Sequence, residues 1–363
     1  MSLIPQLPIT GAWKERFEDV TKLNVYAKDQ PVELSNVKIQ NKNIDGAVLN
    51  GGEFNNNDWS KVSAKKSNFT NLPFRQGILE DVDFSDSTLT NVVFEDVKLL
   101  GVKFFYTTLN NVRFVRCTFN GVGIEKTKMS RIEVIDSKAI SSSFSDGQLV
   151  AVFRNSKLAR GSSETSQGVR LTDLIPPSSL TFEKSELIDA NMERSRLAEL
   201  VIDNSKFDSI YDVGSADRIT VRNSTLDTSF SAMTIGTLSI ENSTIKALSI
   251  LRSKVNTIQL SNCQDMNNFG MYETTTGAVI FTQCQLNDFR PRDATIELLR
   301  VTGGSVKNSK FERMKVKIMI LNNVTLDGEL NFTDAHVDKL ETHNITKQPG
   351  LNLITTGSNV HLE

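Results

Sequence analysis

Large apolar residues recur at every fifth position of this chain from Leu34 to Leu149, which gives 24 successive centres. Only Ala64 and Ala139 among them are small, and 16 of the 19 Phe and Leu residues in this span lie on the count, where chance would place about one in five. A helix repeats near 3.6 residues and a strand near 2, so neither gives this period alone. The spacing predicts a backbone that turns a corner after every five residues.

A chain with this period can close a square coil from four short sides. The residue two positions before each centre is mostly small, as in Val92, Val97 and Val102, so two residues in five point inward. The residue two positions after each centre is Asn or Asp in 11 of 24 cases, and these residues tolerate left-handed corners. Successive coils would then stack as parallel strands, about 4.8 Å apart, with Phe74, Phe94 and Phe114 in one interior column.

The repeats, among them "NVVFED" at 91–96 and "NVRFVR" at 111–116, resemble those of the pentapeptide-repeat family. The resemblance is unbroken over residues 34–149 and reaches 158 with one slip in the count. It implies an all-β fold, a right-handed parallel β-helix solenoid with quadrilateral coils of about 20 residues. Val often replaces the family's commoner Ala at the second inward position, which implies slightly wider coils.

The same count divides the chain into five segments. Residues 1–33 are an N-terminal cap in which "WKERFEDV" forms a short helix, and residues 34–158 are the regular coils. Residues 159–179 are an inserted loop, residues 180–345 a degenerate continuation with coils of about 20 residues, and residues 346–363 a C-terminal cap or tail. In the continuation, four corner residues are expected to stack as a ladder of amides that bond to one another: Asn204, Asn223, Asn242 and Asn262.

Composition limits the partners and the compartment. Lys and Arg number 41 and Asp and Glu 43, so no strong overall field favours nucleic acid, and direct nucleic-acid binding is not expected. No signal peptide or long apolar run is visible, which predicts a chain without a membrane partner. Three sparse cysteines indicate a reducing compartment. With the resemblance, this predicts the bacterial cytoplasm, or export by a route independent of a signal peptide.

Catalytic and metal chemistry find weak support in the residue pattern. The three histidines, His336, His343 and His361, lack Cys or His at ligand spacing, and no cofactor is expected. Two acidic groups could serve a β-helix carbohydrate enzyme: Asp203, Asp208, Asp212 and Asp217, and Asp334 with Asp338 beside His336. Both also fit solvated corners, so the chain is predicted not to be an enzyme. Cys263 and Cys284 are either buried thiols or a bridge between stacked coils.

One surface feature rises above this background. The residue after each centre points outward and is polar in the first twelve repeats, whereas six of the next twelve are apolar. With an adjoining tyrosine, the candidate interaction face consists of Leu100, Phe105, Tyr106, Val115, Ile135, Ile140 and Val150. An exposed apolar face of this kind is expected to contact another segment of the chain or another molecule. Either the loop 159–179 folds over it with Val169, Leu171, Leu174 and Ile175, or it docks a partner protein or a second copy of the chain.

These observations predict a non-enzymatic scaffold that binds another protein through its flat faces. The resemblance adds two alternatives, because some members of the family are bacterial effectors delivered to host cells and others mimic DNA and bind topoisomerases. DNA mimicry requires an acidic stripe, whereas the regular half of this chain carries basic residues such as Lys65, Lys103 and Arg116.

Overall fold

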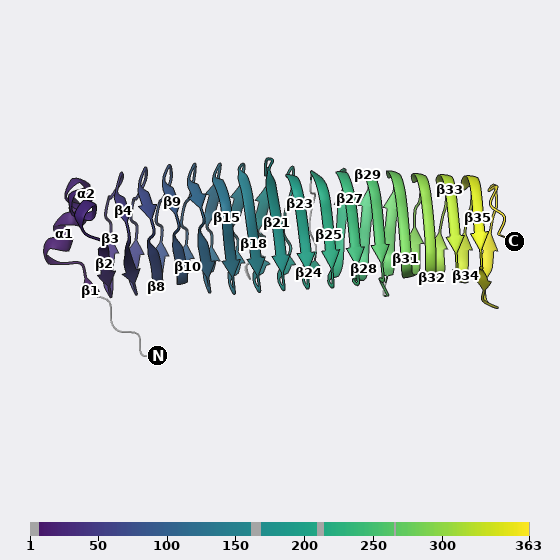
Figure 1. Ribbon diagram of the computed structural model, residues 1–363, viewed down its shortest axis with the longest axis horizontal. Helices are drawn as coiled ribbons and strands as arrows, with labels where there is room; N and C mark the ends of the chain where they lie inside the picture. Colours follow the sequence, from purple (N-terminus) through teal and green to yellow (C-terminus); the bar gives the residue numbers. More distant parts are fainter. Residues whose placement is uncertain (1–6, 161–167, 209–213, 265, 363) are drawn as a thin grey trace. The chain divides into compact units, whose positions relative to one another are not determined.

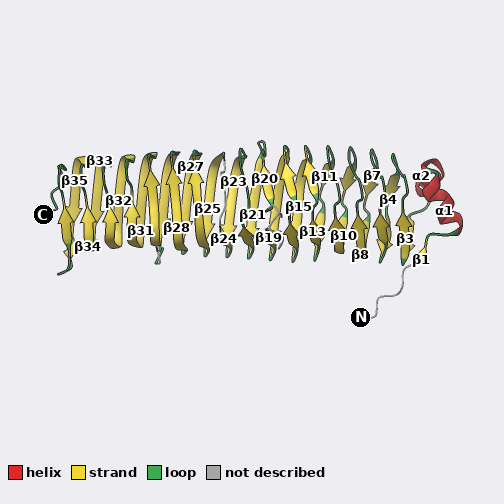
Figure 2. Cartoon of the chain, turned by 180° about the vertical axis from the view of Figure 1, so that it is seen from behind, coloured by secondary structure: helices red, strands yellow, loops and turns green. Residues whose placement is uncertain are grey.

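The computed structural model describes residues 7–160, 168–208, 214–264 and 266–362. The chain divides into two compact units, residues 1–191 (unit 1) and 192–363 (unit 2). Each unit is a stack of parallel strands (Figures 1 and 2). The fold class is a parallel β-solenoid with coils of the predicted length, because Phe74 pairs with Phe94 in unit 1 and Val279 pairs with Leu299 in unit 2.

Two helices and a short strand cover the first coil of unit 1. Helix α1 (Gly11–Glu18) contains most of the predicted "WKERFEDV" helix, and α2 (Val20–Asp29) follows after Asp19. The Asp19 side chain accepts a hydrogen bond from the Thr21 amide, which satisfies one free donor at the start of α2. Phe17 is fully buried and its ring meets Trp59 edge-on at 6.2 Å. Figure 2 shows both helices in red at this end of unit 1.

Many strands of unit 1 have three or four residues because they end at a corner. The strands of unit 1 are β1 (Leu7–Pro8), β2 (Val32–Ser35), β3 (Val37–Gln40), β4 (Val48–Asn50), β5 (Gly52–Asn55), β6 (Asp58–Ser60), β7 (Asn68–Thr70), β8 (Pro73–Glu80), β9 (Thr88–Thr90), β10 (Val93–Leu100), β11 (Thr108–Asn110), β12 (Arg113–Val115), β13 (Thr118–Asn120), β14 (Gly123–Glu125), β15 (Lys128–Ile135), β16 (Lys138–Ile140), β17 (Ser143–Ser145), β18 (Gln148–Arg154), β19 (Lys157–Ala159), β20 (Arg170–Thr172), β21 (Ser178–Glu183) and β22 (Glu186–Ile188). Of these, β8, β10 and β15 run through a corner. We name the four sides by the coil that begins at Phe94: side A (Phe94), side B (Leu99), side C (Phe104) and side D (Leu109).

The corners fall where the sequence places them. Every fifth residue from Asn36 to Asp146 has a positive φ, so each side ends in one left-handed residue. Glycine or Asn and Asp fill many of these positions, but Lys61 and Tyr106 also adopt the left-handed conformation (φ 53° and 55°). The corner is therefore imposed by the stack of coils and not only by residues that prefer it.

The interior of unit 1 is a set of stacked rings, as predicted. Phe54, Phe74, Phe94 and Phe114 pair directly in the strand register, and each ring centroid lies 5.0 Å from the next. Phe94 is fully buried. The predicted slip is also present, because Val134 pairs with Phe153 and not with Arg154, after a register shift in the pairing of β15 with β18.

The inserted segment is shorter than the predicted loop 159–179. Strand β20 continues side C, where Leu171 pairs with Phe144, and β21 continues side A, where Phe182 pairs with Phe153. Val169, Leu171 and Leu174 are fully buried inside the coil. Residues 161–167 of the predicted loop lie outside the described residues. The described remainder forms coil sides because its apolar residues match the interior columns.

Unit 2 has longer strands and fewer left-handed corners. They are β23 (Arg196–Asp203), β24 (Lys206–Asp208), β25 (Ser215–Arg222), β26 (Thr225–Ser231), β27 (Thr234–Glu241), β28 (Thr244–Leu251), β29 (Lys254–Ser261), β30 (Met266–Tyr272), β31 (Thr275–Arg290), β32 (Thr295–Lys310), β33 (Lys315–Asn322), β34 (Thr325–Asn331), β35 (His336–His343), β36 (Thr346–Lys347) and β37 (Asn352–Ile354). Their register repeats close to the interval found in unit 1, as where Val279 pairs with Leu299. The degenerate half is therefore a solenoid too.

The predicted Asn positions in unit 2 are corners, but their bonding differs from the prediction. Asn204, Asn223, Asn242 and Asn262 all have φ near 50°. Within the described residues no hydrogen bond joins these four side-chain amides to one another, and the Asn223 amide instead donates to Asp203 at 3.2 Å. Amide ladders of the expected kind occur in unit 1, where the corner side chains of Asn91 and Asn111 each donate to the Asn one coil earlier.

The last residues of unit 2 form one more partial coil and then turn inward. Strands β36 and β37 both pair with β34. The Asn359 side chain hydrogen-bonds both the amide and the carbonyl of Val337, each at 2.9 Å. Val360 is buried, and Leu362 reaches the interior. The predicted C-terminal cap thus combines two strands with a short apolar plug.

Candidate interaction surfaces

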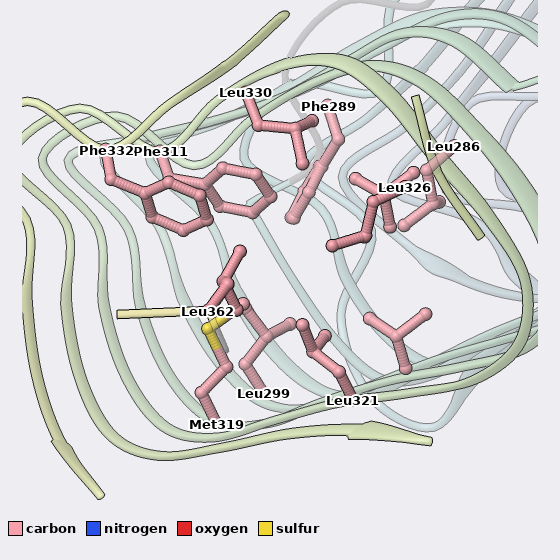
Figure 3. A pocket seen from close by; sticks show the side chains of 12 residues that line it. Leu286, Phe289, Leu299, Phe311, Met319, Leu321, Leu326, Leu330, Phe332 and Leu362 are labelled. Carbon is pink, nitrogen blue, oxygen red and sulfur yellow. The ribbon is translucent and has the colours of Figure 1, made fainter. Parts of the chain in front are cut away.

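One cavity in the interior of unit 2 is too small for a ligand. Twelve apolar side chains line a cavity near its C-terminal end, including Phe311, Phe332 and Leu362 (Figure 3). Its accessible volume is about 10 Å³, which is at the lower limit for one water molecule. No polar group points into it, so this space is packed core.

The acidic candidates for catalysis do not converge. Asp203, Asp208 and Asp217 lie on three strands, β23, β24 and β25, and their neighbours one coil further on are Arg222, Asp227 and Gly236. Asp212 lies outside the described residues. A carbohydrate enzyme needs two carboxyl groups on either side of one bond, and the described members of this group do not provide that geometry.

The histidine candidate is a surface pair. His336 Nε2 lies 3.1 Å from Asp338 Oδ1, and both side chains are exposed. Asp334 occupies a left-handed corner (φ 54°). Among the described residues no group of three or more His, Cys, Asp or Glu side chains is placed to hold a metal ion.

All three cysteines are buried, and none of them forms a disulfide bond. Burial raises the pKa of the Cys117 thiol to about 12, so it stays protonated at neutral pH. A hydrogen bond to Cys284 and burial raise the pKa of Cys263. Cys263 and Cys284 lie on successive coils, because the Cys263 carbonyl accepts a bond from the Gln285 amide.

The seven residues predicted as an interaction face lie on four sides of unit 1. They are Val115 and Ile135 on side A, Leu100 and Ile140 on side B, Phe105 and Tyr106 on side C and its following corner, and Val150 on side D. Two residues lie on the same side only when they are a whole number of coils apart. Most members of this set are instead separated by one or more corners. They therefore form small separate groups.

Most of these seven side chains are already partly covered. Tyr106 and Val150 are the most exposed, at 59% and 39%. The Lys126 amine lies 5.3 Å from the centre of the Tyr106 ring and donates to its hydroxyl at 3.2 Å. The Phe105 ring lies so close over Gly123 that a Cβ there would come within 2.6 Å of it. Phe105 thus packs along its own side of the solenoid.

Arginine and carboxylate side chains alternate along side A of unit 1. Arg75 lies between Glu53 and Glu95, at 3.4 and 3.2 Å, and Arg116 bonds both Glu95 and Asp96. The hydrogen bond from Arg116 holds the pKa of Asp96 below its usual range. Positive and negative side chains on neighbouring coils lie beside each other, so side A carries a nearly neutral row of charges.

A compact apolar surface lies on unit 2, and the sequence reasoning missed it. We call it the β31–β33 patch, and it consists of Ala278, Ile280, Leu298, Arg300, Ile318 and Ile320. The register places Ala278, Leu298 and Ile318 in one outward column and Ile280, Arg300 and Ile320 in the next. The aliphatic members are half-buried and Arg300 is exposed. No ion pair to Arg300 occurs within the part of the chain that the structure describes.

A sequence signal for this patch exists. On earlier coils the outward positions are polar, as in "TLSI" at 237–240 and "TIQL" at 257–260, whereas the equivalent runs are "AVIF" at 278–281 and "IMIL" at 318–321. Strands that are apolar on both faces are typical of strands covered on both faces. The loss of alternation in these two runs therefore marks the patch in the sequence.

Neither α1 nor α2, the helices of the described chain, has the length and apolar content needed to cross a bilayer.

Comparison with known proteins gives matches among solved structures. No family model matches the sequence, and no curated protein matches it. Among solved structures, QnrB1, a plasmid-mediated fluoroquinolone resistance protein, matches at 16% identity and a TM-score of 0.24 over 44% of this chain and 74% of its own. HetL, a pentapeptide repeat protein involved in heterocyst differentiation regulation from the cyanobacterium Nostoc, matches at 12% identity and 0.20 over 96% of each chain. The A-module of the mannuronan C-5 epimerase AlgE4 from Azotobacter vinelandii matches at 11% identity and 0.28 over 93% of this chain and 96% of its own.

These matches include pentapeptide-repeat proteins and a β-helix enzyme. The chain itself has a parallel β-solenoid fold of the pentapeptide-repeat kind, with a left-handed corner at every fifth position from 36 to 146 and with successive coils in direct register, as where Phe74 pairs with Phe94.

Proposed function

We propose that this chain is a non-enzymatic scaffold that binds a partner protein on the β31–β33 patch. The observation that carries the proposal is the patch itself: five aliphatic residues on three successive coils surround the exposed Arg300, which forms no ion pair within the described residues. Arginine is enriched among the hot spots that supply most of an interface's energy, and surrounding contacts that exclude water are typical of them.

The chemistry of the patch defines the kind of partner. Arg300 lies between Ile280 and Ile320 in its column, so a matching surface presents aliphatic side chains around one carboxylate. A carboxylate brought against Arg300 would be partly desolvated by the isoleucines, which strengthens a charge-assisted hydrogen bond. The side A row of alternating charges favours no polyanion or polycation, which supports a protein partner over nucleic acid.

Site-specific photo-crosslinking tests this proposal. A photo-reactive amino acid replaces Lys317, which is exposed beside the patch, and the protein is irradiated in an extract of its source cells. The unmodified patch is expected to give a discrete crosslinked product. The double variant Ile318→Ser, Ile320→Ser should lose that product, because it removes two of the largest anchors.

A matched control exists three coils earlier on the same outward columns. Thr257→Ser, Gln259→Ser changes residues at equivalent positions of the coil, and it should keep the crosslinked product. Both double variants should melt close to the parent temperature, because outward substitutions away from special features usually change the free energy of unfolding by about 0.5 kcal/mol or less. A product that persists in the patch variant, or no product from the parent, would refute the proposed site.

The small apolar pairs of unit 1 are a second candidate for the same function. Leu100 and Ile140 share an outward column of side B, with Asn120 between them. The variant Leu100→Ser, Ile140→Ser in the same experiment, with a photo-reactive residue at Lys138, tests that surface independently of unit 2.

A further inference from the structure

Two of the three cysteines stack directly on each other inside unit 2. Cys263 and Cys284 occupy the same inward position on successive coils. Ser261 pairs with Thr282 just before this position. The Gln285 amide donates to the Cys263 carbonyl at 2.9 Å just after it. Neighbouring strands lie about 4.8 Å apart, and the Cα atoms of a disulfide lie roughly 4.4–6.8 Å apart, so the two sulfur atoms are within reach of each other.

The preceding coils carry serine in the same column. The Ser205 amide donates to the Ser224 hydroxyl at 3.0 Å, and the Ser224 amide donates to the Ser243 hydroxyl at 3.1 Å. The cysteines continue this ladder with sulfur, because the Ser243 amide donates to Cys263 and the Cys263 amide donates to Cys284. Serine therefore fits the position that either cysteine occupies.

The two sulfur atoms differ in their hydrogen bonds. Cys284 accepts from both the thiol and the amide of Cys263, and these bonds lower the pKa of Cys284. Donation of the Cys263 thiol proton to Cys284, together with burial, raises the pKa of Cys263. Cys284 is therefore the sulfur that ionises first, and the thiolate is the form of cysteine that acts as a nucleophile.

The strand pairing is irregular beside these buried thiols. Both cysteines are 0% exposed. Ser261 pairs with Thr282, and Met266 pairs with Leu286. The coil of Cys263 therefore has one residue more than the next coil between these two pairs. A break in a strand ladder favours local opening, and hydrogen peroxide is small enough to enter with water when the corner opens.

We propose that Cys263 and Cys284 form a dithiol site that hydrogen peroxide oxidises to a disulfide between two successive coils. The Cys284 thiolate attacks one peroxide oxygen, the O–O bond breaks, and a sulfenic acid and a hydroxide ion form. The hydroxide takes up the proton that Cys284 released on ionisation. The Cys263 sulfur then attacks the Cys284 sulfur, and the hydroxyl group leaves with the Cys263 proton as water. Two thiols are oxidised, and one peroxide is reduced to two water molecules.

The apolar interior favours the disulfide over further oxidation, because a disulfide carries no charge, whereas a sulfinate would be a buried charge. Cys117 is the internal control in unit 1. It is also buried, but its amide donates to the Ser137 hydroxyl on the next coil. Lys98 pairs with Thr118, so Val97 precedes Cys117 in its column. Cys117 therefore has valine and serine where Cys284 has a second thiol.

Peptide mapping of the folded full chain tests the proposal. The protein is treated with hydrogen peroxide, the peroxide is removed, and free thiols are blocked with a maleimide in denaturant before digestion and mass spectrometry. A linked peptide pair that contains Cys263 and Cys284 is expected, with Cys117 blocked as a free thiol. The oxidised chain should melt at a higher temperature than the reduced chain, because a cross-link restricts the unfolded state. A thiol reductant should reverse both changes.

Serine variants test which sulfur reacts first. In Cys263→Ser, the sulfenic acid at Cys284 lacks the second thiol and should be trapped by dimedone. Cys284→Ser should give at least about tenfold less adduct, since the thiolate fraction falls about tenfold with each unit of pKa. Both variants should melt close to the reduced parent, because serine occupies this column on preceding coils.

Two results would overturn the proposal: both thiols blocked as free after peroxide treatment of the folded parent, or a linkage that forms only when the chain is first unfolded in urea. Equal dimedone adducts in the two serine variants would overturn Cys284 as the attacking sulfur. The Ile318→Ser, Ile320→Ser variant keeps both cysteines and should still form the disulfide, so failure of this inference and failure of the proposed partner site give different results.

Discussion

At the scale of single residues, each five-residue step assigns a fixed role to every position. Phe94 fills the interior, Glu95 faces solvent and Asp96 turns the corner with a φ of 55°. A left-handed residue costs roughly 1–2 kcal/mol unless it is glycine, yet Lys61 and Tyr106 accept it. The stacked rings and strand hydrogen bonds on either side of each corner stabilise the coil enough to offset that cost.

Phe94→Asp and Asp96→Asn separate the interior position from the corner. Phe94 packs between Phe74 and Phe114, so an aspartate there buries a carboxylate without a partner and should lower the free energy of unfolding by about 4 kcal/mol or more. Asn tolerates the left-handed corner, and loss of an exposed ion pair costs about 1 kcal/mol or less. Urea unfolding measures both, and equal shifts in midpoint would contradict the assigned roles.

At the scale of elements, buried hydroxyl groups connect one coil to the next. The second inward position carries Ser or Thr on many coils, and the Ser137 hydroxyl accepts a bond from the Cys117 amide at 2.9 Å and donates to the Ile135 carbonyl at 2.7 Å. Ser156 does the same for the Ser137 amide. These amides lie beyond a corner, where the strand ladder leaves them free, so a small polar side chain is needed there.

Ser137→Ala should cost about 1–3 kcal/mol of unfolding free energy, because it leaves the buried Cys117 amide without an acceptor. Ser130→Ala is the matched control, since Ser130 is an exposed residue on β15 of the same coil and should change stability by about 0.5 kcal/mol or less. Chemical denaturation of the two variants gives the comparison. A Ser137 variant as stable as the Ser130 variant would show that the hydroxyl contributes nothing.

The arginine rows predict a stability that falls in acid. The hydrogen bond from Arg116 lowers the pKa of Asp96, and that from Arg313 lowers the pKa of Asp293. A carboxylate with a lowered pKa contributes stability above its unfolded value, and that contribution is lost as pH falls through the folded pKa. Since the ordinary value is 3.8, the melting temperature should hold from neutral pH down to about 5 and fall below about 4.

Arg116→Gln is the control for this effect. The variant lacks the bond that lowers the pKa of Asp96, so it should melt below the parent at neutral pH, and the difference should shrink as pH drops below about 4. A difference in melting temperature that stays constant over the acid range would assign the role of Arg116 to packing instead of charge.

At the scale of the whole molecule, a coil at the end of a stack needs cover, because a coil can bury its interior only against a neighbour. Unit 1 uses α1 and α2, whose Phe17 and Leu23 complete the first interior layer. The Asn24 side chain also bonds the Val48 amide at 2.8 Å and the Gly46 carbonyl at 3.0 Å, and so replaces a neighbouring strand. Unit 2 uses Asn359 in the same way, but for Val337 alone.

Removal of residues 1–30 should expose the edges of β2 and β3 and the interior around Trp59. Exposed edges pair with other chains, so the truncated protein is expected to form aggregates on size-exclusion chromatography while keeping its β-type circular dichroism. Phe17→Ala is a milder variant that should lower the melting temperature without loss of the edge cover. A truncated chain that remains dispersed and equally stable would show that the helices are dispensable for the fold.

The sequence by itself determined the local geometry of unit 1. The count of five predicted the interior column through Phe94, the corners at Asn36 and Asn111, and the slip before Phe153, since each depends only on a short segment repeated many times. The five-residue count predicts the corners at Lys61 and Tyr106, although neither residue type prefers the left-handed conformation. The members of the candidate face lie on four sides of unit 1, because they are separated by steps that turn a corner.

Only the tertiary structure decided which outward residues share a surface and which segments join the coils. The β31–β33 patch depends on the strand register that brings Ile280 beside Arg300 and Arg300 beside Ile320. The segment 168–179 forms coil sides because Leu171 pairs with Phe144 and continues its interior column. No local sequence pattern specifies this pairing. These features arise from contacts between distant residues, whereas a five-residue period records only what lies within one side of a coil.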